Sequence, residues 1–257
     1  LCELKYAGYR DFAIHGGDGS ISCCLTQLRH VFAGIKFPHI ATLGGGSMNV
    51  VKKHLGIKAN CLEIIRHLQQ EDYTIKRQNS LLVEDRLGFI YADTLVSHFL
   101  ETYYKKAKTI PAAALLIAKL ALSQVFKGKL FSSICKDEQL SLQVDSHEKI
   151  TTVSCANFCS TVSHLPGRVR FFTDAILTSD VFELRSIIAP ATHLAHRVIP
   201  RALLLANKRH KEDSLDIIVR CRLIIEKSLP FSYTLDGELY CSKDKHVSIE
   251  LGEKIPF

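Results

Sequence analysis

The stretch DFAIHGGDGS, residues 11–20, decides the fold that this sequence predicts. Its first five residues are apolar-rich and run into two glycines, which predicts a buried strand that ends in a tight turn. Leu25, Leu28 and Phe32 then recur at helical spacing, so residues 20–32 are predicted to form a helix. Glycines between a strand and a helix let the backbone approach a phosphate, and the start of the helix offers free N–H groups. The stretch therefore predicts a phosphate loop rather than a plain hairpin turn.

A second glycine run repeats this logic further along the chain. Residues 39–43 predict another buried strand, residues 44–47 read Gly-Gly-Gly-Ser, and residues 49–55 predict a helix that Gly56 ends. A further helix is predicted over residues 61–70. Two strand–glycine–helix units indicate an open α/β sheet whose parallel strands end at one crevice. We therefore expect Gly17 and Ser47 to lie within ~15 Å of each other, because both loops would hold one nucleotide.

Three polar side chains of these loops have distinct expected roles. Asp18 is negatively charged, so it is predicted to partner Mg²⁺ or a substrate hydroxyl rather than a phosphate. Ser47 can donate its hydroxyl to a phosphate, and Asn49 can cap the following helix.

The character of the sequence changes after about residue 72. Seven strand-like segments separated by polar turns indicate a β-sandwich or a related all-β domain. They cover residues 73–83, 140–144, 150–156, 169–172, 182–188, 214–225 and 246–251. We therefore expect an α/β domain over residues 1–72, with its N-terminal part missing, and a sandwich domain over 73–257 with a helical insertion near 95–127.

The composition is that of an ordinary globular chain with a moderately basic balance. The 257 residues are 47% hydrophobic and carry a formal net charge of +7, with basic clusters at residues 105–108, 168–170 and 208–211. Nucleotide phosphates, anionic lipid headgroups and nucleic acid all fit such clusters, and solvated surface charge is the alternative. The most apolar stretch, residues 112–126, is shorter than the ~20 residues that a membrane span needs. It predicts a core helix, with a helix on a membrane surface as the alternative.

Cysteine and histidine usage indicates a cytoplasmic protein without a structural zinc site. The nine cysteines are odd in number and form no CxxC pair, so reduced thiols are expected. His193 and His196 form an HxxH pair with no partner motif, which favours a surface helix over a zinc site.

A third motif, Leu235-Asp236-Gly237-Glu238, lies near the end of the chain. A DG pair between strands is a common hairpin signal. If the turn continues as strand, Asp236 and Glu238 point to the same face, and two close carboxylates shift one pKa upward. Either residue could then act as a general base, with an exposed hairpin tip as the alternative.

Together these segments resemble the diacylglycerol kinase-like lipid kinase catalytic family, which includes diacylglycerol kinases, sphingosine kinases and soluble bacterial lipid kinases. HGGDGS, GGSMNVVKKHLG, LGFIYAD (residues 87–93) and DGE occur in the family order over about residues 10–250. The resemblance implies a nucleotide-binding α/β domain followed by a β-sandwich domain. The residues it places on ATP are Gly16, Gly17, Asp18, Gly19, Ser20, Gly46, Ser47 and Asn49.

The resemblance also implies a chemistry, which is ATP-dependent phosphoryl transfer to a lipid hydroxyl with Mg²⁺. It places the general base on Glu238 or Asp236, as in the soluble bacterial members, or on Asp18, as in sphingosine kinases. Asp18 would also hold the Mg²⁺ of the nucleotide. The implied partners are ATP, a lipid with a free hydroxyl and an anionic membrane surface touched from the cytoplasmic side, and no nucleic acid.

Several positions depart from the family pattern. An early NPxSG-like turn would precede residue 1, so the chain is interpreted as N-terminally truncated. Ser22 and Cys23 replace an Asn-Glu pair, and Gly44 replaces a proline. A structural Mg²⁺ segment of some bacterial members matches only in part, because its Asp falls on Ser179 and Asp180 lies one residue late. These departures leave a non-catalytic lipid- or nucleotide-binding relative open as one alternative. An NAD kinase is the other, because it would use the same nucleotide domain and is compatible with the LGF at residues 87–89.

Overall fold

The computed structural model describes residues 1–46, 49–105, 116, 119, 123, 129–165, 169–173, 176, 180–193 and 213–257. Its helical elements are α1 (Cys2–Tyr6), α2 (Asp18–Val31), α3 (Val50–His54), α4 (Cys61–Gln69), α5 (Leu95–Tyr104), α7 (Lys129–Ile134) and η2 (Ala191–His193). Its strands are β1 (Asp11–Ile14), β2 (His39–Thr42), β3 (Arg77–Val83), β4 (Arg86–Gly88), β5 (Ile90–Thr94), β6 (Glu138–Val144), β7 (Ile150–Ser154), β8 (Ala156–Ser160), β9 (His164–Leu165), β10 (Val169–Arg170), β11 (Phe182–Ile187), β12 (Ser214–Val219), β13 (Arg222–Lys227), β14 (Ser232–Leu235), β15 (Glu238–Cys241) and β16 (His246–Pro256).

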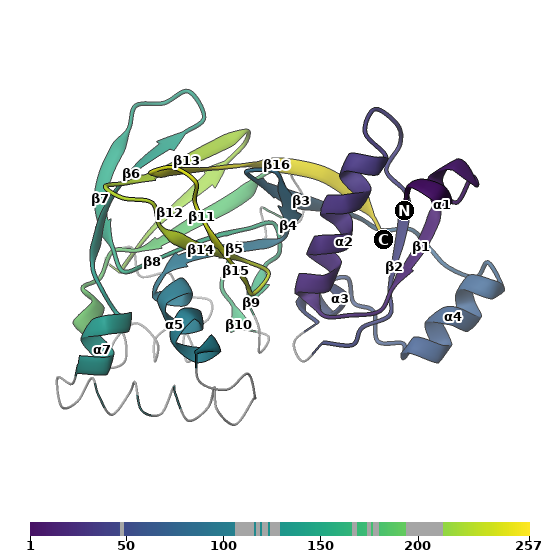
Figure 1. Ribbon diagram of the computed structural model, residues 1–257, viewed down its shortest axis with the longest axis horizontal. Coiled ribbons are helices and arrows are strands. Elements are labelled where there is room, and N and C mark those ends of the chain that lie inside the picture. The colour runs from purple at the N-terminus through teal and green to yellow at the C-terminus, as the bar shows by residue number, and fades with distance from the viewer. Residues whose placement is uncertain are drawn as a thin grey trace.

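The N-terminal part is the predicted α/β unit, and it forms one end of the molecule (Figure 1). Strands β1 and β2 are parallel and in register from Asp11↔His39 to Ile14↔Thr42, so both end at the same edge. Helix α2 buries one apolar face, because Leu25 and Leu28 recur at helical spacing and both are buried. This parallel pairing brings the two glycine turns to one edge, as the sequence predicts.

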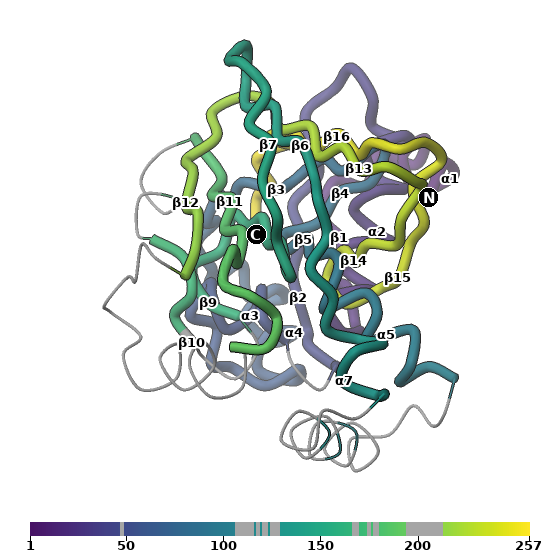
Figure 2. The backbone as a smooth tube through the Cα atoms, turned by 90° about the vertical axis from the view of Figure 1, so that its left-hand side faces the viewer, coloured from purple at the N-terminus to yellow at the C-terminus, as the bar shows by residue number. Residues whose placement is uncertain are grey.

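The described strands from β3 onward form a β-sandwich of two six-stranded antiparallel sheets, apart from the short separate pair β9 and β10. The strand orders are β12-β11-β8-β5-β14-β15 and β4-β3-β16-β13-β6-β7. Their inward-facing apolar side chains, such as Leu142, Leu184 and Ile225, form the main core between the sheets. Helices α5 and α7 lie next to each other beside the sandwich in both views (Figures 1 and 2).

Strand β16 joins the two parts. Its first half pairs with β13 and β3, and after a register shift between Leu251 and Lys254 it continues towards α2 and β2. Ile255 packs in a second buried cluster that contains residues of α2 as well as Phe89. At the chain end, Phe257 and Lys76 exchange two backbone hydrogen bonds of 2.7 Å. The N-terminal core is thus completed by the last residues of the chain, and the domain boundary at residue 72 stays a prediction.

Two predicted strands are wrong as single elements. Residues 214–225 form β12 and β13, because the chain turns at residues 220–221, where the Asp145 carboxylate accepts three backbone N–H groups. Residues 150–156 divide at the fully buried Cys155, whose N–H donates to the carbonyl of Ile187. There the chain leaves the sheet of β7 and enters the sheet of β8. Alternating apolar residues signal strands but not the crossing between two sheets.

Other elements are absent from the sequence prediction or lie outside the described residues. Strands β4, β5, β9, β14 and β15 and most of β8 were not predicted, whereas α5 falls inside the helical insertion expected near 95–127. Most of the predicted helix 112–126 and of the basic cluster 105–108, all of cluster 208–211 and His196 lie outside the described part of the chain. Within the described residues, none of the helices has the length and apolar character needed to cross a membrane.

Candidate functional site: two glycine loops and an acidic turn

The first glycine loop, residues 15–20, ends at the uncapped start of a long helix. Gly17 is the N-cap of the 14-residue α2, and no side chain makes a capping hydrogen bond there. The first N–H groups of a helix have no partner within the helix, and its dipole places positive charge at that end. Ser20 lies over Gly16, where an added β-carbon would come 2.5 Å from the Ser20 Cβ. The start of α2 is therefore suited to an anionic group.

The second glycine loop, residues 44–49, touches the first. A β-carbon added at Gly46 would lie 2.4 Å from the Cα of Gly17, so Gly46 must be glycine for the two backbones to approach this closely, whereas one added at Gly17 would make a tight contact of 3.2 Å with the Cα of Gly46. The Asn49 side chain closes the second loop by donating to the Gly46 carbonyl at 2.7 Å and accepting from the Gly46 N–H at 3.1 Å. Ser47 lies outside the described residues. Its neighbour Gly46 nevertheless brings the second loop against the first.

Asp18 connects the two loops directly. Its Oδ2 accepts the N–H of Val50 at 2.9 Å, and its Oδ1 accepts the N–H of Val51 at 3.1 Å. These are the first two N–H groups of α3, whose own N-cap residue, Asn49, is left-handed and makes no side-chain capping bond. Asp18 therefore caps a helix that begins in the other loop, a role that sequence reasoning missed.

The acidic turn is a two-residue hairpin between β14 and β15. Asp236 (φ +51°) and Gly237 (φ +87°) are both left-handed, and Leu235 pairs with Glu238. The hairpin turn that the DG pair signals is thus present, and the condition under which Asp236 and Glu238 would point to the same face of a strand is not met. The two carboxylates do not follow the alternation of a strand, and they have separate environments.

The Asp236 carboxylate points inward to the backbone between β4 and β5. It accepts the N–H groups of Phe89 at 3.1 Å and Ile90 at 2.9 Å. Gly88 makes room for it, because a β-carbon there would lie 2.7 Å from Asp236 Oδ2. Burial raises the pKa of Asp236 to about 8, against the lowering effect of its hydrogen bonds, and the Asp18 charge adds to the rise. The raised pKa favours the protonated form of Asp236 near neutral pH, and its hydrogen bonds to the two N–H groups anchor the turn.

The Glu238 carboxylate lies instead at the start of α2. A β-carbon added at Gly19 would be 2.5 Å from Glu238 Oε1 and 2.7 Å from its Cγ. Glu238 is exposed, so its carboxylate is accessible at the first glycine loop. Tyr104, at the end of α5, donates its hydroxyl to the Gly237 carbonyl at 2.9 Å and so supports the turn. Burial and the nearby Glu238 carboxylate raise the pKa of Tyr104, which keeps its hydroxyl a donor.

Two departures from the family pattern have visible structural consequences. Ser22 donates a hydrogen bond to the Leu87 carbonyl and also reaches the Asp236 carboxylate, so it fastens α2 to the β4–β5 segment. Gly44 has a φ of +76°, which the proline expected there could not adopt. Cys23, next to Ser22, is exposed on α2. Neither Ser22 nor Tyr104 carries a sequence signal for its contact with the turn.

The predicted metal residues do not form a cluster in the described residues. Asp180 pairs with Lys254 at 2.8 Å and accepts from Asn79 at 3.3 Å, and these hydrogen bonds lower its pKa. Both Asp18 oxygens already accept backbone N–H groups. Within the part of the chain that the structure describes, no group of three or more His, Cys, Asp or Glu side chains is arranged to hold a metal ion. The side chains that the structure describes therefore do not by themselves form a dedicated magnesium site.

The bridge made by Asp18 can be tested by replacing it with asparagine. Asp18→Asn removes one acceptor oxygen, so we expect a loss of about 1–3 kcal/mol in the free energy of unfolding. The Val50 and Val51 amides should also exchange faster with deuterium, as measured by NMR at equal temperature and pH.

Asp145→Asn is the matched control, because Asp145 also accepts backbone N–H groups, but at residues 220–222. It should lower stability without a selective change at Val50 and Val51. Unchanged exchange of these two amides in Asp18→Asn would contradict the bridging role.

Comparison with known proteins shows similarity in structure rather than in sequence. No protein-family model matches the chain, and no curated protein matches it. One solved structure from Bacillus anthracis, described as a candidate diacylglycerol kinase, superposes with a TM-score of 0.66 at 16% identity over 98% of this chain and 78% of that chain. A second structure from this organism, described as a diacylglycerol kinase, gives 0.63 at 12% identity over 99% and 78%. An Archaeoglobus fulgidus NAD kinase in complex with ATP gives 0.50 at 15% identity over 100% and 79%. The predicted fold class is thus confirmed, and the chain has the kinase-type fold of the diacylglycerol kinase-like proteins.

Proposed function

We propose that this chain is an ATP-dependent lipid kinase that transfers the γ-phosphoryl group to a lipid hydroxyl. The observation that carries the proposal is the position of Glu238, whose exposed carboxylate lies against Gly19 in the first turn of α2. An acidic side chain from the sandwich thereby meets a helix start that is suited to phosphate. A phosphate donor and a proton acceptor are the two elements that hydroxyl phosphorylation needs.

The nucleotide triphosphate would bind at the two glycine loops. Gly16, Gly17, Gly19 and Ser20 provide the backbone at the start of α2, and Gly46 and Asn49 form the facing loop. Ser47 belongs to the same proposal through its hydroxyl. The similarity to an NAD kinase that was solved with ATP supports ATP as the donor. The Mg²⁺ that accompanies ATP would be held chiefly by phosphate oxygens and water, because Mg²⁺ commonly takes only one or two carboxylates from a protein.

Glu238 is the general base in this proposal, and Asp236 positions it. Asp236 is committed to the Phe89 and Ile90 N–H groups, and its raised pKa lowers the fraction of molecules in which it is ionised at neutral pH. Glu238 is free to accept the proton of a hydroxyl that approaches a phosphate at Gly19. Asp18 holds the two loops in contact, so its replacement would disturb nucleotide binding before it disturbed proton transfer.

Two other functions give different outcomes in one assay. The similarity to an NAD kinase at a TM-score of 0.50 favours an NAD kinase as a second candidate, and the departure at Cys23 favours a non-catalytic relative. Incubation with γ-labelled ATP and either a panel of lipid extracts or NAD separates the three. Label in a lipid product supports the proposal, label in the dinucleotide supports an NAD kinase, and binding of ATP without transfer supports a non-catalytic protein.

The role of Glu238 predicts a specific kinetic defect. Glu238→Gln removes the proton acceptor and keeps the size of the side chain, so lipid phosphorylation should fall by ~10²–10⁴-fold. The affinity for ATP, measured by calorimetry, should stay within a few-fold of the wild-type value. The exposed Glu148, in the turn between β6 and β7, provides a control through Glu148→Gln, which should retain full turnover.

Asp236→Asn should behave differently, with a loss of turnover that follows a loss of stability. The outcome against this assignment is near-normal turnover in both Glu238→Gln and Asp236→Asn, together with abolished turnover and normal ATP affinity in Asp18→Asn. Asp18 would then be the base.

Contact with an anionic membrane surface belongs to the same proposal. A lipid acceptor and a net charge of +7 lead us to expect peripheral binding. In flotation assays, the bound fraction should be higher with phosphatidylserine vesicles than with neutral vesicles, and it should decrease as salt rises from about 0.05 to 0.5 M because salt screens exposed charges. Binding that is insensitive to salt and to lipid charge would contradict this expectation.

A further inference from the structure

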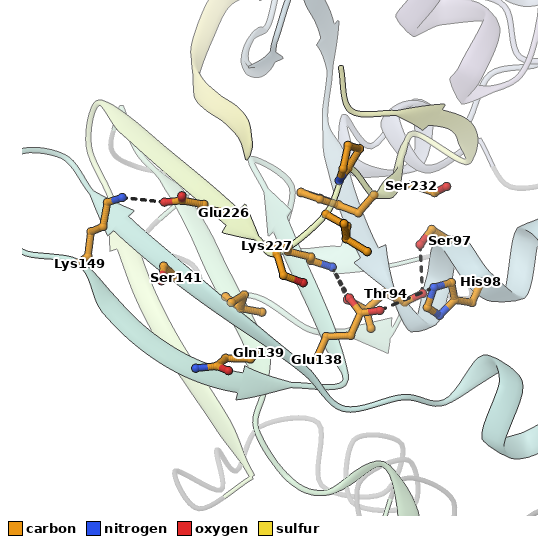
Figure 3. A pocket seen from close by; sticks show the side chains of 15 residues that line it. Thr94, Ser97, His98, Glu138, Gln139, Ser141, Lys149, Glu226, Lys227 and Ser232 are labelled. Atoms are coloured by element: carbon orange, nitrogen blue, oxygen red, sulfur yellow. Dashed lines mark hydrogen bonds and ion pairs between the residues drawn. The ribbon is translucent and has the colours of Figure 1, made fainter. Parts of the chain in front are cut away.

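A second polar cavity lies in the β-sandwich, away from the glycine loops. It has a volume of about 760 Å³ and is lined by the start of α5, by β6 and by the segment that joins β13 to β14 (Figure 3). None of its lining residues belongs to the glycine loops or to the acidic turn. Its volume falls in the range of ~300–1,000 Å³ that small-molecule sites occupy.

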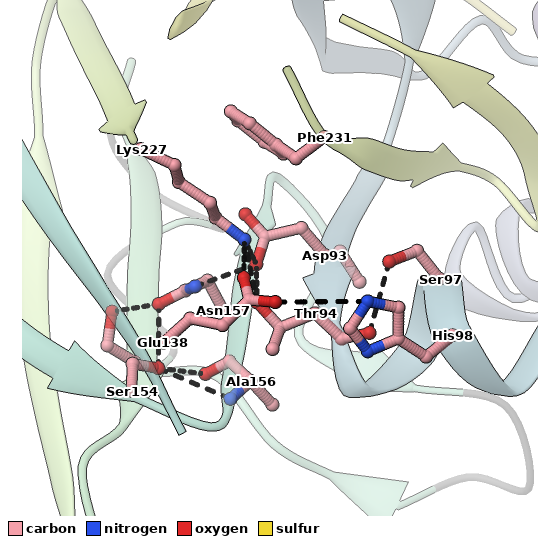
Figure 4. A network of polar contacts seen from close by, with 12 residues as sticks. Asp93, Thr94, Ser97, His98, Glu138, Ser154, Ala156, Asn157, Lys227 and Phe231 are labelled. Atoms are coloured by element: carbon pink, nitrogen blue, oxygen red, sulfur yellow. Dashed lines mark hydrogen bonds and ion pairs between the residues drawn. The ribbon is translucent and has the colours of Figure 1, made fainter. Parts of the chain in front are cut away.

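A buried ion network forms the floor of this cavity (Figure 4). Lys227 is 8% exposed, and its Nζ lies 2.8 Å from Glu138 Oε2, 2.8 Å from Thr94 Oγ1 and 3.4 Å from Asp93 Oδ1. The Phe231 ring covers the ammonium group at 4.4 Å. Burying such charges costs desolvation energy that hydrophobic packing would avoid. A contribution to stability therefore does not explain why these charged side chains are buried together.

Asp93 is satisfied entirely within the protein. It is fully buried and accepts hydrogen bonds from Tyr91 at 2.8 Å, Thr94 at 2.8 Å and Asn157 at 2.7 Å. Thr94 has a φ of +54°, a conformation that is strained for a β-branched residue. Such strain persists where the surroundings enforce it, and it concentrates at functional sites. Asp93 and Thr94 thus fix Lys227 and leave Glu138 as the carboxylate that meets the cavity.

Lys227 contacts the Oε2 atom of Glu138, and the other carboxylate oxygen, Oε1, faces the Nε2 atom of His98. Glu138 Oε1 lies 3.8 Å from His98 Nε2, which is too long for a direct hydrogen bond. His98 Nδ1 lies 3.3 Å from the Ile134 carbonyl, a position that requires a hydrogen on Nδ1, so Nε2 offers a lone pair when the ring is neutral and forms an ion pair with Glu138 when the ring is protonated. Both side chains are part-exposed at the cavity. One donor group placed between them would satisfy both acceptors.

The charge around this position favours a cation. The buried network contains two carboxylates, Asp93 and Glu138, against one ammonium group, Lys227, so it has an excess of negative charge when the neighbouring His98 ring is neutral. At the rim, Lys149 and Glu226 pair at 2.6 Å and cancel each other. A metal ion is not favoured, because the described residues contain no group of three ligands and Lys227 already occupies the centre of the network. Leu140, Leu229 and Pro230 supply an apolar part of the wall.

We propose that this cavity binds a small ligand with a protonated primary amine, which donates to Glu138 and His98 while its apolar part lies on the wall near Pro230. The site is independent of the proposed phosphoryl transfer. The class of ligand is inferred from the excess of carboxylates over ammonium groups and from the two acceptors, Glu138 and His98. The glycine loops play no part in this inference.

The proposal is tested with two probes of equal size, n-hexylamine and n-hexanol, by calorimetry and by NMR of the His98 ring. The wild-type protein should bind the amine at least about tenfold more tightly than the alcohol, because a charge-assisted hydrogen bond is worth more than a neutral one. The amine should also shift the His98 ring signals.

Glu138→Gln should abolish the preference for the amine, and the rim variant Glu226→Gln should keep it. His98→Phe fills the same space without an acceptor and should also weaken amine binding, so it decides the matter if Glu138→Gln fails to fold. Equal affinity for the two probes in the wild-type protein would overturn the proposal. So would a preference for the amine that survives both Glu138→Gln and His98→Phe.

Discussion

The carboxylate of Asp18 is the interaction on which the candidate site depends. Its two oxygens hold the first N–H groups of α3, so the start of one helix and the loop before another are fixed to each other. This bridge acts together with the approach of Gly46 to Gly17, which leaves no room for a β-carbon at Gly46. A carboxylate in a phosphate loop is unfavourable for anion binding by its charge. Its value here is structural, since it orients two backbone segments whose own N–H groups can receive a phosphate.

The sandwich contributes the carboxylate of Glu238, and hydrogen bonds to backbone groups hold the turn that carries it. Asp236 is anchored by two N–H groups at the β4–β5 junction, and the Tyr104 hydroxyl donates to the Gly237 carbonyl. Glu238 is thereby left free against Gly19. The two parts meet through α2, which Ser22 fastens to the β4–β5 segment, and the last residues of β16 complete the buried cluster beneath it. The packing of α2 against the β4–β5 segment and the end of β16 therefore positions both the acidic turn and the first glycine loop.

The sequence predicted the glycine loops well, because glycine between a strand and a helix has few structural alternatives. Parallel pairing of β1 and β2 then follows from the order of the elements. The roles of Asp18 and Asp236 were not predictable, since each depends on backbone N–H groups that are 32 or more positions away in the chain. The Lys227 network escaped prediction for the same reason. Its members come from α5, β5, β6 and β13, and none of them forms a local motif. Periodicity identifies strands and helices, whereas polar networks arise from how the sheets are stacked.

The central claim is that the two glycine loops and the acidic turn surround one nucleotide triphosphate. Its most direct test is amide-resolved hydrogen exchange with and without a non-hydrolysable ATP analogue and Mg²⁺. The account predicts slower exchange at residues 16–20, at 44–46 and at Gly237, with unchanged exchange at the distant turn of residues 220–221. Protection confined to other parts of the chain, or equal exchange at both glycine loops with and without the analogue, would contradict it.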